Sequence, residues 1–462
     1  MEENLFREFP EVSAEQWKQQ IQRDLKGADY NEKLIYYSPD GIKVQPFYHS
    51  EELKENVLPP PPEKWFICEK IQVATAKEGN AKAKYVLEKG GESLWFVLSE
   101  EVDPAVLFDG IDLTELPIFI KLRFLSEKYY ILLQHYLKNR ESRVYLQTDI
   151  IGNLARTGNW YFDHQQDFYV LESMIERSSG FRAVVSIDAS LYQNAGANIP
   201  HQLAFSLAHL NEYLNYMEGK TAKLGDFQPQ FILASGGNYF FEIAKVRALR
   251  WLYANLAREY GLPETCHILA EPTRRDKTLY DYNVNLLRTT TESMSAILGG
   301  ADAVCNMPYD TIFHKPNNFG ERIARNQLLI LKNEAYFDKV SNPADGSYYI
   351  ENLTRQFAEA ALEIFKEIEA GGGFLKQLEK GIIQQQIGES AAREQQLFDD
   401  GTLTLLGTNK FPNPEDQMEH QLEKEPFAQV LQNNRVIDPI REKRLSEKAE
   451  KERIQKERTI LT

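Results

Sequence analysis

The chain has 462 residues, of which 42% are hydrophobic and 26% are charged, and its formal net charge is −15. These proportions are ordinary for a globular protein, and the length is ample for a large buried core. The acidic balance argues against nucleic acid or an anionic membrane as a partner, because either polyanion would be repelled over most of the surface.

Residues 1–64 are predicted to form an arm that precedes the main domain. Ser13, with Gln16 three residues later, makes a capping box, and apolar residues then recur at helical spacing as far as Gly27. The four prolines at 59–62 cannot lie inside a helix and indicate an extended connector. We expect this arm to contact another subunit or to lie along its own domain.

Residues 65–335 alternate short apolar runs with longer segments of helical periodicity. Leu203, Leu207 and Leu210, for example, recur at the spacing of one helical face. The apolar runs predict eight strands, at 71–74, 94–99, 117–122, 144–149, 182–187, 230–235, 266–270 and 302–305. Eight strands interleaved with helices predict an α/β fold, a (β/α)₈ TIM barrel whose functional site would lie at the carboxyl ends of the strands.

The rest of the chain is predicted to be mostly helical. Residues 336–424 form a helical extension in this prediction, because Phe357 and Ala361 begin an apolar stripe at helical spacing. Residues 425–462 are rich in Lys, Arg and Glu and predict a charged helical tail that is solvated or docked on a partner. The mixed signs of its charges disfavour an arm that binds nucleic acid.

Cysteine usage and the N-terminal sequence indicate a compartment. The three cysteines form neither an even set nor a C-x-x-C pair, which favours a reducing cytoplasm over a disulfide framework. Met1–Asn4 is acidic, and no apolar segment typical of a signal peptide follows it. No apolar run approaches the roughly 18 residues of a membrane-spanning helix. We therefore expect a cytoplasmic protein.

No catalytic or metal-binding motif is recognisable in the chain. None of the eight histidines occurs in H-E-x-x-H or another metal-ligand spacing, and there is no G-x-S-x-G elbow for a nucleophilic serine. Polar residues near the predicted strand ends either form a site or face water as loop residues do. These residues are Asp149, Asp188, Glu271, Arg274, Arg275 and Asp276.

Several segments nevertheless resemble the methylmalonyl-CoA mutase family. Arg288–Gly300, Glu321–Gln327 and Asp345–Glu351 are similar to its last barrel helices and the turn that follows, and Gly41–Tyr48 resembles its small, or beta, subunits. The resemblance extends to about residue 410. It implies a barrel that, in the active subunits of the family, threads coenzyme A along its axis and stacks on a C-terminal cobalamin domain.

The positions that face substrate in that family are changed here. Residues 186–196 resemble a signature with adjacent Tyr and His residues, and Ser190 and Leu191 stand in their place. Leucine can donate neither a proton nor a hydrogen bond, so it cannot support a thioester oxygen. The arginine that pairs with the substrate carboxylate falls at Arg156 or, without a gap, at Thr157. The degenerate positions are Lys70, Arg156, Thr157, Ser190, Leu191 and Cys305.

The cobalamin module is also missing from the sequence. The Asp-x-His-x-x-Gly motif that supplies the cobalt ligand occurs nowhere, and residues 411–462 are too few for such a domain. The resemblance therefore implies a small subunit without catalytic residues, metal or cofactor of its own. Its large partner in a heterodimer would bind adenosylcobalamin and interconvert methylmalonyl-CoA and succinyl-CoA.

Two other functions remain open at this point. The chain could be an autonomous TIM-barrel enzyme with a rebuilt site at Asp188, Glu271 and Arg274, or a regulatory module that retains an acyl-CoA ligand. Bulky side chains along the barrel axis would favour the non-catalytic subunit, whereas an open polar pocket would favour an enzyme. The sequence also leaves open whether the chain forms a homodimer when it is alone.

Overall fold

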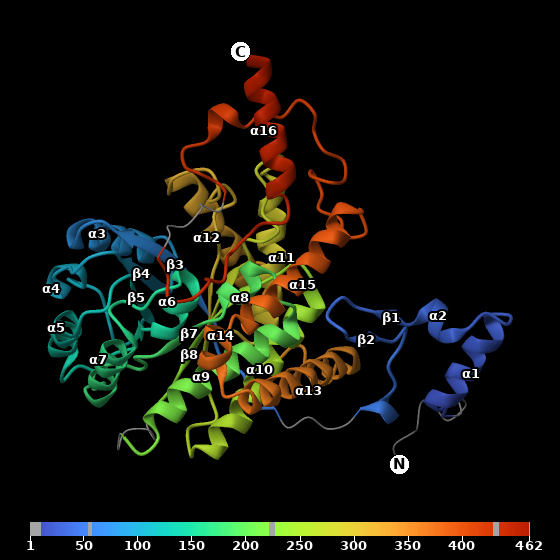
Figure 1. The fold of residues 1–462 in the computed structure, drawn as a ribbon, viewed down its shortest axis with the longest axis horizontal. Coiled ribbons are helices and arrows are strands. Elements are labelled where there is room, and N and C mark those ends of the chain that lie inside the picture. The colour runs from blue at the N-terminus through green and yellow to red at the C-terminus, as the bar shows by residue number, and fades with distance from the viewer. Residues whose placement is uncertain (1–10, 54–57, 221–226, 428–433, 462) are drawn as a thin grey trace.

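The computed structural model describes residues 11–53, 58–220, 227–427 and 434–461. The remaining residues include the acidic N-terminus, part of the connector before the prolines and part of the charged tail, and expectations about them lie outside the described residues. Figure 1 shows a central barrel, an N-terminal arm that extends away from it, and a C-terminal helix that stands above it. None of the described helices is long and apolar enough to span a membrane.

Eight parallel strands form the barrel, in the order β6-β5-β4-β3-β10-β9-β8-β7. An isolated parallel bridge between Tyr145 and Ala183 brings the two ends of this sheet together. Each of the eight predicted apolar runs overlaps one strand, and the prediction of a (β/α)₈ barrel is confirmed. The strands are β3 (Phe66–Val73), β4 (Ser93–Leu98), β5 (Ile118–Leu122), β6 (Val144–Gln147), β7 (Ser186–Asp188), β8 (Gln230–Ser235), β9 (His267–Pro272) and β10 (Ala303–Cys305).

Helices surround the strands and bury their outward-facing side chains in a large apolar core. Most of these helices begin at a side-chain cap, such as Asp149 or Asn198, that accepts a hydrogen bond from the first turn. The helices of this part are α3 (Ala76–Glu88), α4 (Pro104–Leu107), α5 (Glu127–Leu137), α6 (Ile150–Thr157), α7 (His164–Glu176), α8 (Ser190–Ala195), α9 (Ile199–Met217), α10 (Tyr239–Glu259), α11 (Val284–Leu298) and α12 (Asn318–Asn333).

The N-terminal arm is built as its sequence predicts at the first helix. The hydroxyl of Ser13 accepts from the amide of Gln16, and the Gln16 side chain accepts from the amide of Ser13, so both halves of the capping box are present. None of the residues of the first helix is buried. The arm contains α1 (Ala14–Asp24), α2 (Tyr30–Leu34), the hairpin β1 (Tyr36–Tyr37) and β2 (Lys43–Val44), and the short 3₁₀ helix η1 (Ser50–Glu52).

The hairpin, rather than the first helix, joins the arm to the barrel. A carboxylate oxygen of Asp40 accepts from the amide of Ile199 at 3.0 Å, in the first turn of α9. The backbone of Lys43 exchanges two hydrogen bonds with the Gln356 side chain. The helix α1 therefore lies at the far end of the arm, away from the barrel (Figure 1).

A helical extension follows the barrel. Phe357 and Ala361 lie on the buried face of α13, which packs against α9 and α10. The extension contains α13 (Tyr348–Ala370), α14 (Phe374–Glu379), α15 (Ile382–Asp399) and the 3₁₀ helix η3 (Glu419–Gln421), and the last helix is α16 (Glu447–Leu461). Residues 435–446, which the sequence predicts within a helical tail, are not helical, and they are called the C-terminal strap below.

Candidate functional site: the mouth of the barrel

The inward-facing side chains of the barrel change character along each strand. On β3, Phe66 and Cys68 lie in an inner apolar core, and Lys70, two residues further, lines a cavity at the carboxyl end. On β5, Phe119 is likewise followed by Lys121. Because side chains two apart lie on the same face of a strand, these pairs divide the barrel interior into an apolar lower part and a charged mouth.

Bulky side chains fill the lower part along the barrel axis. The rings of Phe119 and Tyr145 lie 5.3 Å apart, and the His267 ring lies 4.4 Å from that of Tyr145. Burial lowers the pKa of His267 to about 4, so this imidazole is neutral near pH 7. Gln147 donates across the interior to Gln230 at 2.7 Å. The axis is therefore closed by packed rings and amides.

A cavity of about 420 Å³ remains above this packing, at the mouth. The Lys70 ammonium lies 3.7 Å from the ring centroid of Trp95 and forms an ion pair with Glu271. The two charges come from β3 and β9, which the sequence places 201 residues apart. The mouth thus brings together Lys70 and Glu271, two of the candidates that the sequence indicates, but it pairs them with each other.

Asp188, at the end of β7, forms ion pairs with two cations of the mouth. One of its oxygens accepts from Lys121 at 2.6 Å and from Arg156 at 3.0 Å, and the other accepts from the Ser190 hydroxyl. Burial alone would raise the pKa of Asp188, but the charges of Lys121 and Arg156 outweigh it and hold the pKa well below its usual range. Asp188 is therefore permanently ionised and is not a general acid at neutral pH.

Arg156 points into the mouth, whereas Thr157 closes the end of helix α6. The Thr157 hydroxyl donates to the backbone carbonyls of Asn153 and Asn159 at 2.8 and 2.9 Å. The Arg156 guanidinium forms ion pairs with Asp188 and with Glu442 of the C-terminal strap. The charge that the family resemblance assigns to a substrate carboxylate is therefore neutralised by carboxylates of the chain itself.

The C-terminal strap is held across the mouth by backbone hydrogen bonds at both ends. At one end, the amide of Ile440 donates to Ala155 of α6 at 2.7 Å. At the other end, the amide of Leu445 donates to Arg275 at 2.9 Å, and the Arg275 side chain donates to the carbonyl of Lys443 at 2.8 Å. The strap therefore covers part of the mouth and carries Glu442 to its place beside Arg156.

The remaining candidate residues lie outside the mouth cavity. Leu191 is 1% exposed and packs in the core between strands and helices. Its side chain therefore does not face the mouth, where the family resemblance expects a histidine that contacts substrate. Cys305 lies in the inner apolar core beside Cys68, whose thiol pKa is raised well above its ordinary value by burial and by its hydrogen bond to Cys305. Arg275 turns toward α15, where it pairs with Glu394.

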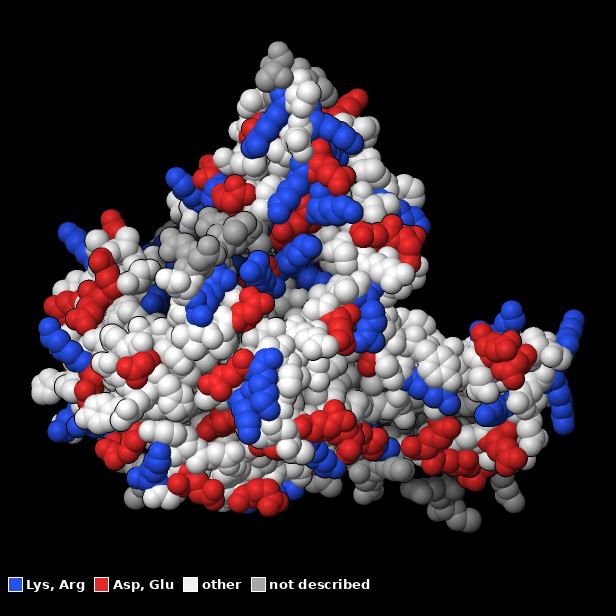
Figure 2. Space-filling model, in the orientation of Figure 1, with Lys and Arg blue, Asp and Glu red and all other residues white. Residues whose placement is uncertain are grey.

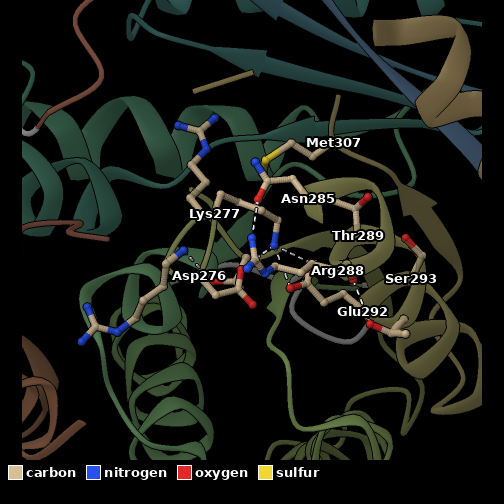
Figure 3. Close-up of polar contacts among 12 residues, drawn as sticks. Asp276, Lys277, Asn285, Arg288, Thr289, Glu292, Ser293 and Met307 are labelled. Atoms are coloured by element: carbon tan, nitrogen blue, oxygen red, sulfur yellow. Dashed lines mark hydrogen bonds and ion pairs between the residues drawn. The ribbon is translucent and has the colours of Figure 1, made fainter. Parts of the chain in front are cut away.

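Asp276 belongs to a second charged cluster, which Figure 3 shows. The ammonium of Lys277 donates to both oxygens of Glu292 at 2.7 and 2.8 Å and also pairs with Asp276. Nearby on α11, Arg288 donates to Asn285 at 2.8 Å. Lys277 and Glu292 are each 1% exposed, and burial together with the neighbouring Asp276 carboxylate raises the pKa of Glu292 well above its ordinary value. This cluster joins the loop after β9 to α11, and Asp276 is its member that lines a separate cavity of about 390 Å³.

Three residues that pair with side chains of the mouth carry no recognisable signal in the sequence. Lys121 stands in an apolar run, and Glu442 is one acid among many in a charged segment. His209 lies 2.9 Å from Asp149, which also caps α6, so this strand-end carboxylate is used structurally. Only the alternation of Phe119 and Lys121 could have indicated that one of these three residues faces the interior.

Among the described residues, no group of three His, Cys, Asp or Glu side chains is arranged to hold a metal ion.

The chain is similar to a set of known proteins. The sequence profile of the family described as methylmalonyl-CoA mutase matches residues 96–459. A methylmalonyl-CoA mutase small subunit from Porphyromonas gingivalis is 34% identical, over 89% of this chain and 71% of its own length. A small subunit from Streptomyces virginiae is 30% identical over 88% and 72%, and the mitochondrial methylmalonyl-CoA mutase of Homo sapiens is 27% identical over 90% and 62%.

Proposed function

Because the chain belongs to the methylmalonyl-CoA mutase family, we propose that it is the small, non-catalytic subunit of a heteromeric adenosylcobalamin-dependent mutase. In this proposal a large partner subunit in a heterodimer binds the cobalamin and interconverts methylmalonyl-CoA and succinyl-CoA. The present chain stabilises that partner in the cytoplasm. The names of the relatives from Porphyromonas gingivalis and Streptomyces virginiae support the assignment to a small subunit.

The filled barrel axis is the observation that carries the proposal. Active members of the family need an open axis for coenzyme A, and here the rings of Phe119, Tyr145 and His267 occupy it. These side chains are buried or nearly so, and each contacts the others, so no minor side-chain rotation opens a channel. A barrel packed in this way supports a scaffold and not a substrate tunnel.

The charges of the mouth support the same proposal. Lys70 is paired with Glu271, and Asp188 with Lys121 and Arg156, so the residues that an autonomous enzyme would use are occupied by one another. An acid–base catalyst needs a group that changes protonation near the working pH. The lowered pKa of Asp188 removes that property from this carboxylate. The enzyme alternative is left with Glu271, which is paired with Lys70, and with Arg274, which supplies charge but no proton transfer.

The N-terminal arm has the exposed aromatic surface that a subunit contact requires. Tyr36 and Tyr37 of the hairpin are 54% and 65% exposed, and Trp17 of α1 is 43% exposed and stacks on Phe47 at 3.9 Å. Aromatic side chains are enriched at protein interfaces because they bury a large apolar area while retaining a polar atom. The arm is therefore the proposed contact with the large subunit.

The proposal is tested by expressing the chain alone and together with a large mutase subunit from the same source. The chain alone is expected to show neither methylmalonyl-CoA turnover nor the absorbance change of bound cobalamin, and the co-expressed pair is expected to elute as one complex. Turnover by the pure chain, or separate elution of the two chains, would contradict it.

A matched pair of variants tests the arm. Replacing Tyr36 and Tyr37 by Ser is expected to weaken association with the large subunit at least about tenfold, since aromatic anchors dominate interfaces. The control is Tyr169→Ser on α7, which is 63% exposed but distant in sequence from the arm. Equal association of the two variants would place the contact elsewhere.

A further inference from the structure

A second cavity, of about 920 Å³, adjoins the mouth cavity and differs from it in charge. The two cavities share Lys70, Gln72, Arg123 and Arg274 in their walls. The second cavity extends from there between the end of β3, the loop after β10 and the start of α12. Seven lysine and arginine side chains and four carboxylates line it, in a chain whose net charge is −15. On the face of the molecule drawn in Figure 2, by contrast, acidic and basic side chains are interspersed.

Several of these cations are already neutralised by the wall itself. Lys82 pairs with Glu321, and Arg325 pairs with Glu69. Four others have no ion pair or side-chain hydrogen bond to any described residue, and they come from four separate segments of the chain. These are Arg123, Arg274, Lys315 and Lys424. The carboxylates that flank Lys424 in the sequence accept from backbone amides instead, Glu423 from Lys315 and Glu425 from Phe427.

Two of the unpaired cations, Arg274 and Lys424, lie close enough to repel one another. Burial and the charge of Arg274 lower the pKa of Lys424, with only a smaller opposing effect from Asp310. Asp310 itself lies 3.0 Å from His314 and accepts from Asn317 at 2.7 Å, so its contacts lie on its own loop. Like charges gathered in a concave wall raise the local concentration of anions and are relieved when one binds.

We propose that this second cavity binds a small phosphorylated molecule through Arg123, Arg274 and Lys424. The planar guanidinium of arginine offers two parallel N–H donors that match phosphate oxygens, and lysine adds a compact charge. A phosphate ester or diphosphate carries two or more negative charges, which suits three cations better than a single carboxylate does. The volume exceeds that of a phosphate group and leaves room for an organic part.

This ligand site is separate from the role proposed for the whole chain. It lies at the mouth, outside the filled axis, and it needs no residue of a partner. Binding is therefore measurable on the isolated full chain, and failure of the site would leave the subunit proposal untouched. A ligand held here would contact the loops after β5 and β9 and the segment after η3 together.

Calorimetric titration of the full chain with inorganic pyrophosphate at low ionic strength tests the site, with inorganic phosphate and succinate as parallel probes. Pyrophosphate is expected to bind more tightly than phosphate, and succinate more weakly than both. In the double variant Arg123→Gln/Arg274→Gln, pyrophosphate affinity should fall at least about tenfold. The control Arg140→Gln removes an exposed arginine of the loop after α5 and should leave affinity unchanged. Equal affinity in the double variant and the wild type, no binding up to about 10 mM, or succinate binding as tightly as pyrophosphate would overturn the proposal.

A single variant separates binding from folding. Lys424→Gln removes one of the repelling charges, so the free chain should melt at the same or a higher temperature while pyrophosphate binds more weakly. Unchanged pyrophosphate affinity would exclude Lys424 from the site, and a lower melting temperature would contradict the repulsion between Lys424 and Arg274. Arg274→Lys keeps the charge and should retain more affinity than Arg274→Gln, and the reverse order would contradict a role for that charge.

Discussion

Replacing Phe119 by Ala tests whether the barrel axis is packed as described. The Phe119 side chain is fully buried, and its ring lies 5.3 Å from both Tyr145 and His267. Removing the ring forfeits about 2 kcal/mol of apolar transfer free energy and leaves a cavity of roughly 100 Å³, which costs about 2 kcal/mol more after partial collapse. The expected loss in the free energy of unfolding is therefore about 4 kcal/mol.

Urea unfolding followed by tryptophan fluorescence measures this loss, because Trp95 lies in the same inner core. The control is Phe319→Ala, whose side chain is 55% exposed and whose removal should cost less than about 1 kcal/mol. Equal losses in the two variants, or a loss below about 1.5 kcal/mol for Phe119→Ala, would show that the ring is not packed in the axis. The rings would then no longer exclude coenzyme A from the barrel axis.

Three other perturbations probe the strap, the arm and the buried charges. Glu442→Gln removes the ion pair with Arg156 and should loosen the strap, whose Ile440 amide is bonded to Ala155. Hydrogen exchange of that amide should accelerate by a factor that corresponds to about 1–2 kcal/mol. An unchanged exchange rate would refute the anchoring role of Glu442. Burial raises the pKa of Asp40 to about 6 from an unfolded value near 3.9, so its contribution to stability is greatest below about pH 4 and declines as the pH rises to 6. In Asp40→Asn the melting temperature should therefore fall less between about pH 4 and pH 6 than it does in the wild type. Identical pH profiles of the two proteins would contradict this role of Asp40. Lys277→Met leaves Glu292 and Asp276 without their cation and should lower the free energy of unfolding, measured in urea, by about 3–5 kcal/mol. The double variant Lys277→Met/Glu292→Leu should recover part of this loss. An unchanged free energy of unfolding in Lys277→Met would show that this cation does not stabilise the buried carboxylates.

The sequence predicts the barrel well because its signals are local. Apolar runs such as 230–235 and 144–149 are long enough to indicate strands, and the capping box at Ser13 marks the start of a helix within a few residues. The family resemblance adds that substrate-facing positions are altered. These observations determine the architecture and the region of the site, since a barrel places its loops at one end.

The packing inside the barrel could not be predicted in the same way. Strands of a parallel barrel are buried on both faces, so Phe119 and its neighbour Ile120 are equally apolar in the sequence although only Phe119 faces the axis. The pairs in the mouth join segments far apart, such as Arg156 with Glu442, 286 residues away. No local pattern encodes such a pair, because any acidic residue of the charged tail would fit it equally well.

The distance in sequence between Arg156 and Glu442 of the strap also has a consequence for biosynthesis. Because a chain emerges from the ribosome from its N-terminus, every barrel strand up to Cys305 is available for folding well before Glu442 is made. Arg156 must therefore remain without one of its two carboxylate partners while the helical extension is synthesised. The mouth is covered only after residues 435–446 have been made, and a nascent chain stalled before residue 435 carries an uncovered barrel.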